Sequence, residues 1–129
     1  MKTIFTFLIA VVILPYMSFV SIEEVDDVIS ALNKGDAATM AKFFDNNVEI
    51  SILGKTGIYS TKQAESILKD FFDNNPVESF EMLHKGENNG ATYCTGNLKT
   101  KNGVYRTTVF MKIKGAKNVL QTLRFELLK

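Results

Sequence analysis

The second half of this 129-residue sequence alternates apolar and polar side chains with a period of two, which is typical of β-strands with one buried face. Glycine-containing segments interrupt the alternation, and their Asn-Gly pairs favour tight hairpins because both residues tolerate positive φ. We therefore expect an antiparallel meander whose apolar face must be covered by another layer. The four predicted strands are residues 77–85, 91–100, 104–114 and 119–128.

The residues before this meander predict helices that can cover it. Ser21 and Glu24 form a capping box, and apolar side chains recur at helical spacing from there to Leu32. Gly35 is expected to end this helix in a left-handed conformation, and Asp36 is expected to begin a short second helix. The predicted buried side of the second helix consists of Met40, Phe43 and Phe44.

Two short strands and a third helix are predicted between the second helix and the meander. Residues 48–52 alternate in the manner of a strand, and Ile58 with Tyr59 predicts a brief second strand after a glycine turn. Ser60 and Gln63 form another capping box, which opens the helix. Its apolar residues follow the helical spacing and are Ala64, Ile67, Leu68, Phe71 and Phe72.

The first 20 residues have the features of an export signal. Lys2 precedes an apolar run at residues 4–14, which only Thr6 interrupts, and the helix-breaking Pro15 follows it. We predict a signal peptide at residues 1–20, a single domain at residues 21–129, and a periplasmic or extracellular location with no membrane span after signal removal. An uncleaved anchor is the alternative, because no small-x-small triplet precedes Ser21.

Composition argues against several classes of function. A formal net charge of +1 gives no general attraction to nucleic acid, and we expect no nucleic-acid partner. Cys94 is the single cysteine, which excludes an intrachain disulfide, and His84 is the single histidine. The sequence therefore predicts neither a metal site nor a cofactor.

The order of these elements resembles the nuclear transport factor 2-like, or cystatin-like, fold over residues 21–128. The segment FFDNNVEISILGKTGIYSTKQAESILKDFFDNNP, followed by SFEMLHKG, is also similar to a family of small secreted bacterial proteins of unknown function. The resemblance implies an α+β, cone-shaped fold in which N-terminal helices pack on a bent antiparallel sheet, with a pocket at the concave face. That superfamily includes enzymes, transport adaptors and binders, so the fold alone does not select a function.

The candidate residues for such a pocket are His84, Tyr59, Tyr93 and Tyr105. Strand alternation places His84 on the face of Phe80 and Met82, where an imidazole can act as a general base. The alternative is a half-buried histidine that hydrogen-bonds at a strand end, with the tyrosines as amphipathic core or rim residues. Cys94 is expected to be a packing residue, and no catalytic residue is assigned.

A candidate partner surface consists of Arg106, Phe110, Lys112 and Arg124. The basic residues alternate out of phase with the apolar residues of the last two strands, so they are predicted to form a band on the outer face. Such a band suits an acidic partner, an anionic glycan or a lipid headgroup, and Phe110 suits a homodimer through the sheet. Solvated side chains that discourage sheet association are the alternative.

Three functional hypotheses follow from these patterns. The main one is a secreted or periplasmic binding protein without catalysis, which uses a concave pocket or a sheet face to hold a small apolar or anionic ligand. The second is a small-molecule isomerase, dehydratase or hydrolase, and the third is a cell-envelope protein-interaction domain. The enzyme is less favoured because Glu49, Glu81 and Glu126 are predicted to lie opposite the apolar strand faces.

Overall fold

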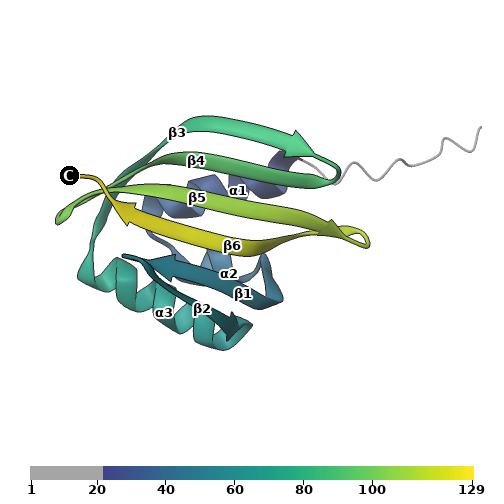
Figure 1. Ribbon diagram of the computed structural model, residues 1–129, viewed down its shortest axis with the longest axis horizontal. Helices are drawn as coiled ribbons and strands as arrows, with labels where there is room; N and C mark the ends of the chain where they lie inside the picture. Colours follow the sequence, from purple (N-terminus) through teal and green to yellow (C-terminus); the bar gives the residue numbers. More distant parts are fainter. Residues whose placement is uncertain (1–21) are drawn as a thin grey trace, which may run out of the picture.

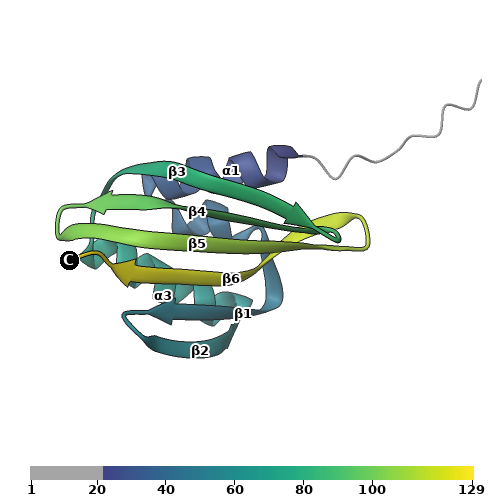
Figure 2. The same ribbon diagram turned by 45° about the horizontal axis from the view of Figure 1, so that its top comes forward.

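The computed structural model describes residues 22–129, in which three helices lie against one face of a bent sheet (Figures 1 and 2). The helices are α1 (Ile22–Lys34), α2 (Ala37–Ala41) and α3 (Thr61–Asn74). The strands are β1 (Phe44–Ile52), β2 (Lys55–Ser60), β3 (Val77–Asn88), β4 (Ala91–Thr100), β5 (Gly103–Lys114) and β6 (Lys117–Leu127). We call the side of the sheet that the helices cover the inner face, and the opposite side the open face.

The six strands follow the order β2-β1-β6-β5-β4-β3. Strands β3 to β6 form the predicted antiparallel meander, whereas β1 pairs in parallel with β6 and antiparallel with β2. The hairpin between β3 and β4 turns at Asn89 and Gly90, which both have positive φ, as expected of an Asn-Gly turn. β3 extends to Asn88, beyond the predicted end at residue 85, so the meander is longer than the sequence predicted.

The break between α1 and α2 forms as predicted. Gly35 has a φ of 65°, and a side chain there would lie 2.9 Å from a methyl carbon of Val77, so glycine suits the position on both counts. The Asp36 carboxylate accepts hydrogen bonds from the hydroxyl and backbone N–H of Thr39, which lower the pKa of Asp36. The break therefore fixes the angle at which the chain leaves α1.

The prediction that Phe43 and Phe44 belong to the second helix was wrong. α2 ends at Ala41, and Phe44 is the first residue of β1, where it pairs with Leu120 of β6. The backbone N–H of Leu120 donates to the carbonyl of Phe43 at 2.6 Å. Pairing with a strand distant in sequence therefore outweighs the local helical spacing of the apolar residues.

α3 places the aromatic rings of Phe71 and Phe72 against the inner face. Its predicted capping box is present, with Ser60 accepting from the Gln63 N–H and Gln63 accepting from the Ser60 N–H. The Phe71 ring lies 4.5 Å from the Phe125 ring and 5.1 Å from the Tyr105 ring between centroids. These rings fill one end of the inner face.

α1 is held to the sheet by two polar side chains. Asn33 accepts a hydrogen bond from the backbone N–H of Phe80 on the edge strand β3, at 3.0 Å. Glu24 accepts one from the backbone N–H of Asn118 on β6, also at 3.0 Å. The predicted capping box at Ser21 and the predicted signal peptide lie outside the described residues. No helix within residues 22–129 is long and apolar enough to cross a membrane.

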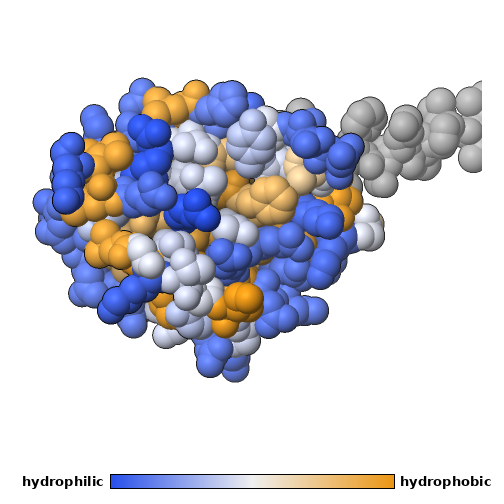
Figure 3. Space-filling model, in the orientation of Figure 1, coloured by the Kyte–Doolittle hydropathy of each residue, from blue (hydrophilic) through white to orange (hydrophobic). Residues whose placement is uncertain are grey.

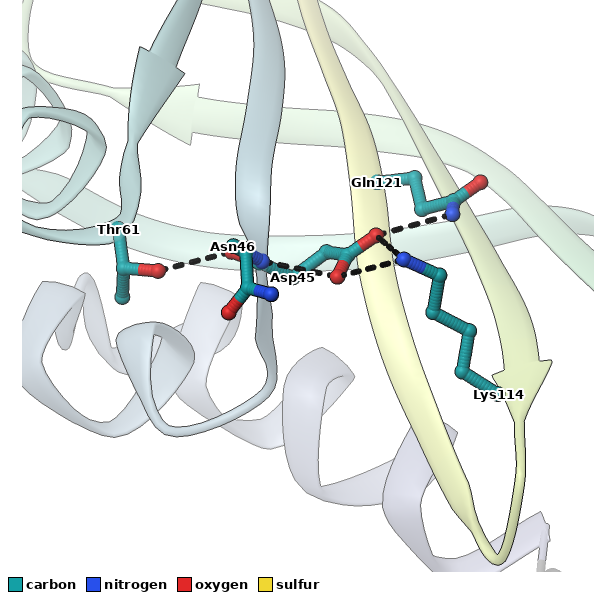
Figure 4. A network of polar contacts seen from close by, with 5 residues as sticks. All are labelled: Asp45, Asn46, Thr61, Lys114 and Gln121. Atoms are coloured by element: carbon teal, nitrogen blue, oxygen red, sulfur yellow. Dashed lines mark hydrogen bonds and ion pairs between the residues drawn. The ribbon is translucent and has the colours of Figure 1, made fainter.

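Asp45 joins β1 to the distant β5–β6 hairpin, where the register between β1 and β6 is interrupted (Figure 4). Its carboxylate lies 3.0 Å from the Lys114 ammonium and accepts a hydrogen bond from the Gln121 amide at 3.1 Å. The Asp45 carbonyl accepts from the Thr61 hydroxyl at the start of α3. The hydrogen bond from Lys114 is the main cause of the lowered pKa of Asp45.

Candidate functional site on the open face of the sheet

The four candidate pocket residues do not meet in one pocket. Tyr105 is buried on the inner face, where its hydroxyl donates to the Asn75 side chain at 2.9 Å. Tyr59 lines a separate hollow of about 260 Å³, which Ile67 of α3 and Ile50 and Ile52 of β1 also line. His84 and Tyr93 lie together on the open face.

A bulge in β3 accounts for the position of His84. Met82 pairs with Gly96 and His84 pairs with Thr95, so Leu83 is an extra residue on β3. One extra residue moves every following side chain to the opposite face. The prediction that His84 shares a face with Phe80 and Met82 was therefore wrong, and Lys85 takes the inner position near Asp26 of α1.

Tyr93 forms an aromatic platform beside this bulge. It pairs with Gly86, and a side chain at Gly86 would overlap the Tyr93 ring, so the ring lies over the glycine backbone. The His84 Nε2 atom is 3.2 Å from the Tyr93 hydroxyl, and the two rings are 5.7 Å apart between centroids. With 37% of its surface exposed, Tyr93 presents a positioned ring to solvent.

The candidate partner residues share the open face. Phe110 pairs with Tyr93 on one side and with Thr122 on the other, while Arg124 pairs with Thr108. Arg106 pairs with Glu126 and donates from Nε to the Asn97 side chain at 3.0 Å; Lys112 pairs with Val119. The predicted basic residues therefore lie on one face of the sheet. Glu49 and Glu126 lie on the same face, so acidic and basic side chains alternate there.

A shallow hollow of about 390 Å³ lies in the middle of this face. Its lining combines a carboxylate, a guanidinium, two hydroxyls and a phenyl ring, contributed by Glu49, Arg124, Thr108, Thr122 and Phe110. Figure 3 shows the open face, where apolar surface over the middle strands is surrounded by weakly polar and hydrophilic surface. This arrangement offers hydrogen-bond donors, acceptors and an apolar contact to a ligand that lies on the sheet.

The remaining reactive groups do not form a catalytic arrangement with this hollow. Cys94 lies on the inner face and is 1% exposed, and burial raises the pKa of its thiol to about 11. Among residues 22–129, no three histidine, cysteine, aspartate or glutamate side chains are grouped to hold a metal ion.

Comparison with known proteins identifies the family. Residues 25–126 match the family described as Domain of unknown function (DUF4783). The chain belongs to the DUF4783 family. A DUF4783 structure from Bacteroides uniformis is 27% identical with a TM-score of 0.78, over 81% of this chain and 96% of that one. One from Bacteroides ovatus is 23% identical with a TM-score of 0.78, over 80% and 94%.

This DUF4783 protein also has the expected nuclear transport factor 2-like fold. An NTF2-like protein of unknown function from Cytophaga hutchinsonii aligns with a TM-score of 0.58 at 8% identity, over 81% of this chain and 86% of that one. No curated protein matches the sequence. The family and the α+β cone fold inferred from resemblance are confirmed, and the names of these relatives assign no activity.

Sequence reasoning missed four contributors to the open face of this DUF4783 protein: Glu49, Thr108 and Thr122 in the hollow, and Gly86 beneath Tyr93. Gly86 carried a usable signal, since a glycine inside a strand often marks a close approach. The adjacent apolar residues Met82 and Leu83 also interrupt the period of two, which is the local sign of the bulge. The threonines carry no signal before the strand register is known.

Proposed function

We propose that this DUF4783 protein is an exported, non-catalytic binding protein that holds its partner on the open face of its sheet. The observation that carries the proposal is the contrast between the two faces. The inner face is lined by buried side chains such as Leu98, Val109 and Leu123, whereas the open face has no helix over it within residues 22–129. The candidate partner residues and the hollow lie on that uncovered side.

Support for export comes from the sequence of residues 1–20, with Lys2 before the apolar run and Pro15 after it. N-terminal sequencing of the exported protein should give a start between Phe19 and Ile22. Material that retains Met1 in the membrane fraction would indicate an anchor and would remove the signal-peptide part of the proposal.

Support for a binding role over catalysis comes from the placement of His84. An isomerase-type reaction requires a base or acid enclosed with its partner in an apolar site. The side-chain partner of His84 is the Tyr93 hydroxyl, and both residues are exposed on the open face. The imidazole is therefore separated from the inner face by the sheet itself.

Cross-linking in intact cells tests the proposal directly. The protein and an R106E/R124E variant are cross-linked and captured, and K62E/K69E serves as a charge-matched control with both changes on exposed positions of α3. We expect R106E/R124E to lose the captured partner while the control retains it, because reversed charges on a docking face repel the same partner. Equal capture by both variants would place the contact away from the open face.

A second copy of the chain is one partner that the open face suits. The face interleaves Arg106 and Arg124 with Glu49 and Glu126, so two copies can oppose unlike charges around Phe110. Light scattering coupled to size-exclusion chromatography should then report a dimer that R106E/R124E weakens. A monomer at high concentration would exclude the second copy and leave other partners to the cross-linking experiment.

A further inference from the structure

The geometry points to an uncharged oligosaccharide as the ligand of the open face. A row of side chains crosses four neighbouring strands there, and we call it the ligand row: Tyr93 on β4, Phe110 on β5, Thr122 on β6 and Glu49 on β1. This inference rests on the proposed function, in that it takes the open face as the binding face, and it adds the chemistry of the ligand.

The first support is the Tyr93 platform at one end of the ligand row. The ring is held over Gly86 and by the His84 contact at 3.2 Å, so little side-chain freedom is lost when a ligand stacks on it. The ring of a sugar presents C–H groups on its faces, and these pack on an aromatic ring while the hydroxyls at the rim stay free to hydrogen-bond. An exposed, positioned tyrosine is the group that such stacking requires.

The second support is the unused hydrogen-bonding capacity of the hollow. Glu49, Arg124, Thr108 and Thr122 make no side-chain hydrogen bond or ion pair with any residue in the part of the chain that the structure describes. The carboxylate accepts two hydrogen bonds and the guanidinium donates several, a pairing that matches neighbouring sugar hydroxyls, which both donate and accept. The hollow therefore offers both hydrogen-bond donors and hydrogen-bond acceptors to the hydroxyls of a sugar.

The third support is the charge balance of the face. Glu49 lies beside Arg124 in the hollow, and Glu126 pairs with Arg106 next to it. Because the two signs alternate around the hollow, that part of the face does not build the single-sign potential that concentrates a polyanion, and Lys112 lies beyond the ligand row on β5. Such a surface does not repel an uncharged ligand, whereas both glutamates repel a polyanion.

The length of the ligand row indicates an oligosaccharide. Neighbouring strands are about 4.8 Å apart, so the row spans about 14 Å from β1 to β4. The hollow is shallow and lies on a broad face, which admits a chain that continues beyond the contact at both ends. A single small sugar would reach either the Tyr93 platform or Glu49, and the two groups together require several linked units.

An NMR titration of the isotope-labelled protein tests this inference. The probes are maltohexaose, cellohexaose and chitohexaose, with a hyaluronan hexasaccharide as the anionic comparison. We expect at least one neutral hexasaccharide to shift the resonances of Tyr93, Phe110 and Thr122 and to bind more tightly than the anionic one. Y93A should weaken that binding at least about tenfold, while Y59A, the same change at the separate hollow, should leave it within about twofold.

A second pair of variants keeps the test valid if Y93A disturbs the strand. E49Q removes the charge from the ligand row with little change in shape and should weaken binding about fivefold, whereas E65Q on α3 should have no effect. No shift with any neutral hexasaccharide, tighter binding of the anionic one, or equal binding by wild type and both row variants would overturn the inference. If cross-linking still depends on Arg106 and Arg124 in that case, the partner is a protein and the proposed function stands without the sugar.

Discussion

The inner and open faces of the same strands carry different kinds of side chain. Along β5, Tyr105, Val109 and Met111 are buried against the helices, while Arg106 and Phe110 between them are partly accessible on the other side. The buried set holds the fold together through apolar contact, which requires no specific chemistry. The accessible set carries the charges, hydroxyls and rings that a partner can recognise, so the parity of a residue along the strand decides its role.

The single extra residue at the Leu83 bulge decides which face of the sheet the following side chains of β3 occupy. Without it, His84 would follow Phe80 and Met82 onto the inner face and Lys85 would lie outside. With it, the imidazole reaches the Tyr93 hydroxyl and the long Lys85 side chain approaches Asp26 of α1. One extra residue thus places a titratable group on the open face instead of in the core.

The largest difference between the faces should appear when a phenylalanine is truncated on each. Phe125 is fully buried against Phe71, so F125A should lower the free energy of unfolding by about 3–5 kcal/mol. F110A on the open face should cost about 1 kcal/mol or less, because it removes cross-strand contacts at a partly exposed site. Urea unfolding of both variants measures the difference.

The two truncations also test whether the open face is free in solution. If F110A costs as much as F125A, the open face is covered by a stable partner copy, and its loss should then grow with protein concentration. A concentration-independent loss of that size would instead place Phe110 in the core and contradict the assignment of the two faces.

The thiol of Cys94 reports how tightly the inner face is closed. With the pKa raised from about 9 to about 11, only about a thousandth of the thiol is ionised at pH 8, against about a tenth for an unfolded cysteine. Ionisation alone should therefore slow labelling by Ellman's reagent roughly 100-fold in the folded protein, and burial slows it further. The protein unfolded in urea serves as the control, and rapid labelling of the folded protein would mean that β4 separates from its covering.

The sequence predicted the inner face better than the open face for a physical reason. Burial selects apolar residues, so helical spacing identified Leu68, Phe71 and Phe72 as core without any structure. The open face depends on which strands are neighbours, and its hollow joins Glu49 to Thr122 across a parallel pairing of distant segments. Local patterns contain no information about that pairing.

The Asp45 network should make a smaller contribution to stability than the inner face. D45N replaces the contact to Lys114 and Gln121 and should cost about 1 kcal/mol, since Lys114 is 55% exposed and water screens the ion pair. D73N, which breaks the largely exposed pair with Lys69, should change the free energy of unfolding by a few tenths of a kcal/mol at most.

The effect of D45N should also depend on pH in a defined direction. Because the pKa of Asp45 is lower in the folded protein than in the unfolded chain, its stabilisation is complete above the unfolded value of about 4. It is lost as the pH falls through the lower, folded pKa. The difference between wild type and D45N should therefore be constant near neutral pH and disappear in acid, and a difference that grows in acid would contradict the assigned ion pair.

A small effect is also expected for His84, and it distinguishes the two faces directly. On the open face, H84A removes one exposed contact to the Tyr93 hydroxyl and should change the free energy of unfolding by less than about 0.5 kcal/mol. On the inner face, the same truncation would open a cavity or leave a buried polar partner unpaired and would cost about 2 kcal/mol or more. F80A is the comparison variant, because Phe80 is the preceding buried inner residue of β3 and its truncation should cost about 2 kcal/mol or more. Because the bulge at Leu83 is what places His84 outside, a large loss for H84A would show that β3 runs without it in solution.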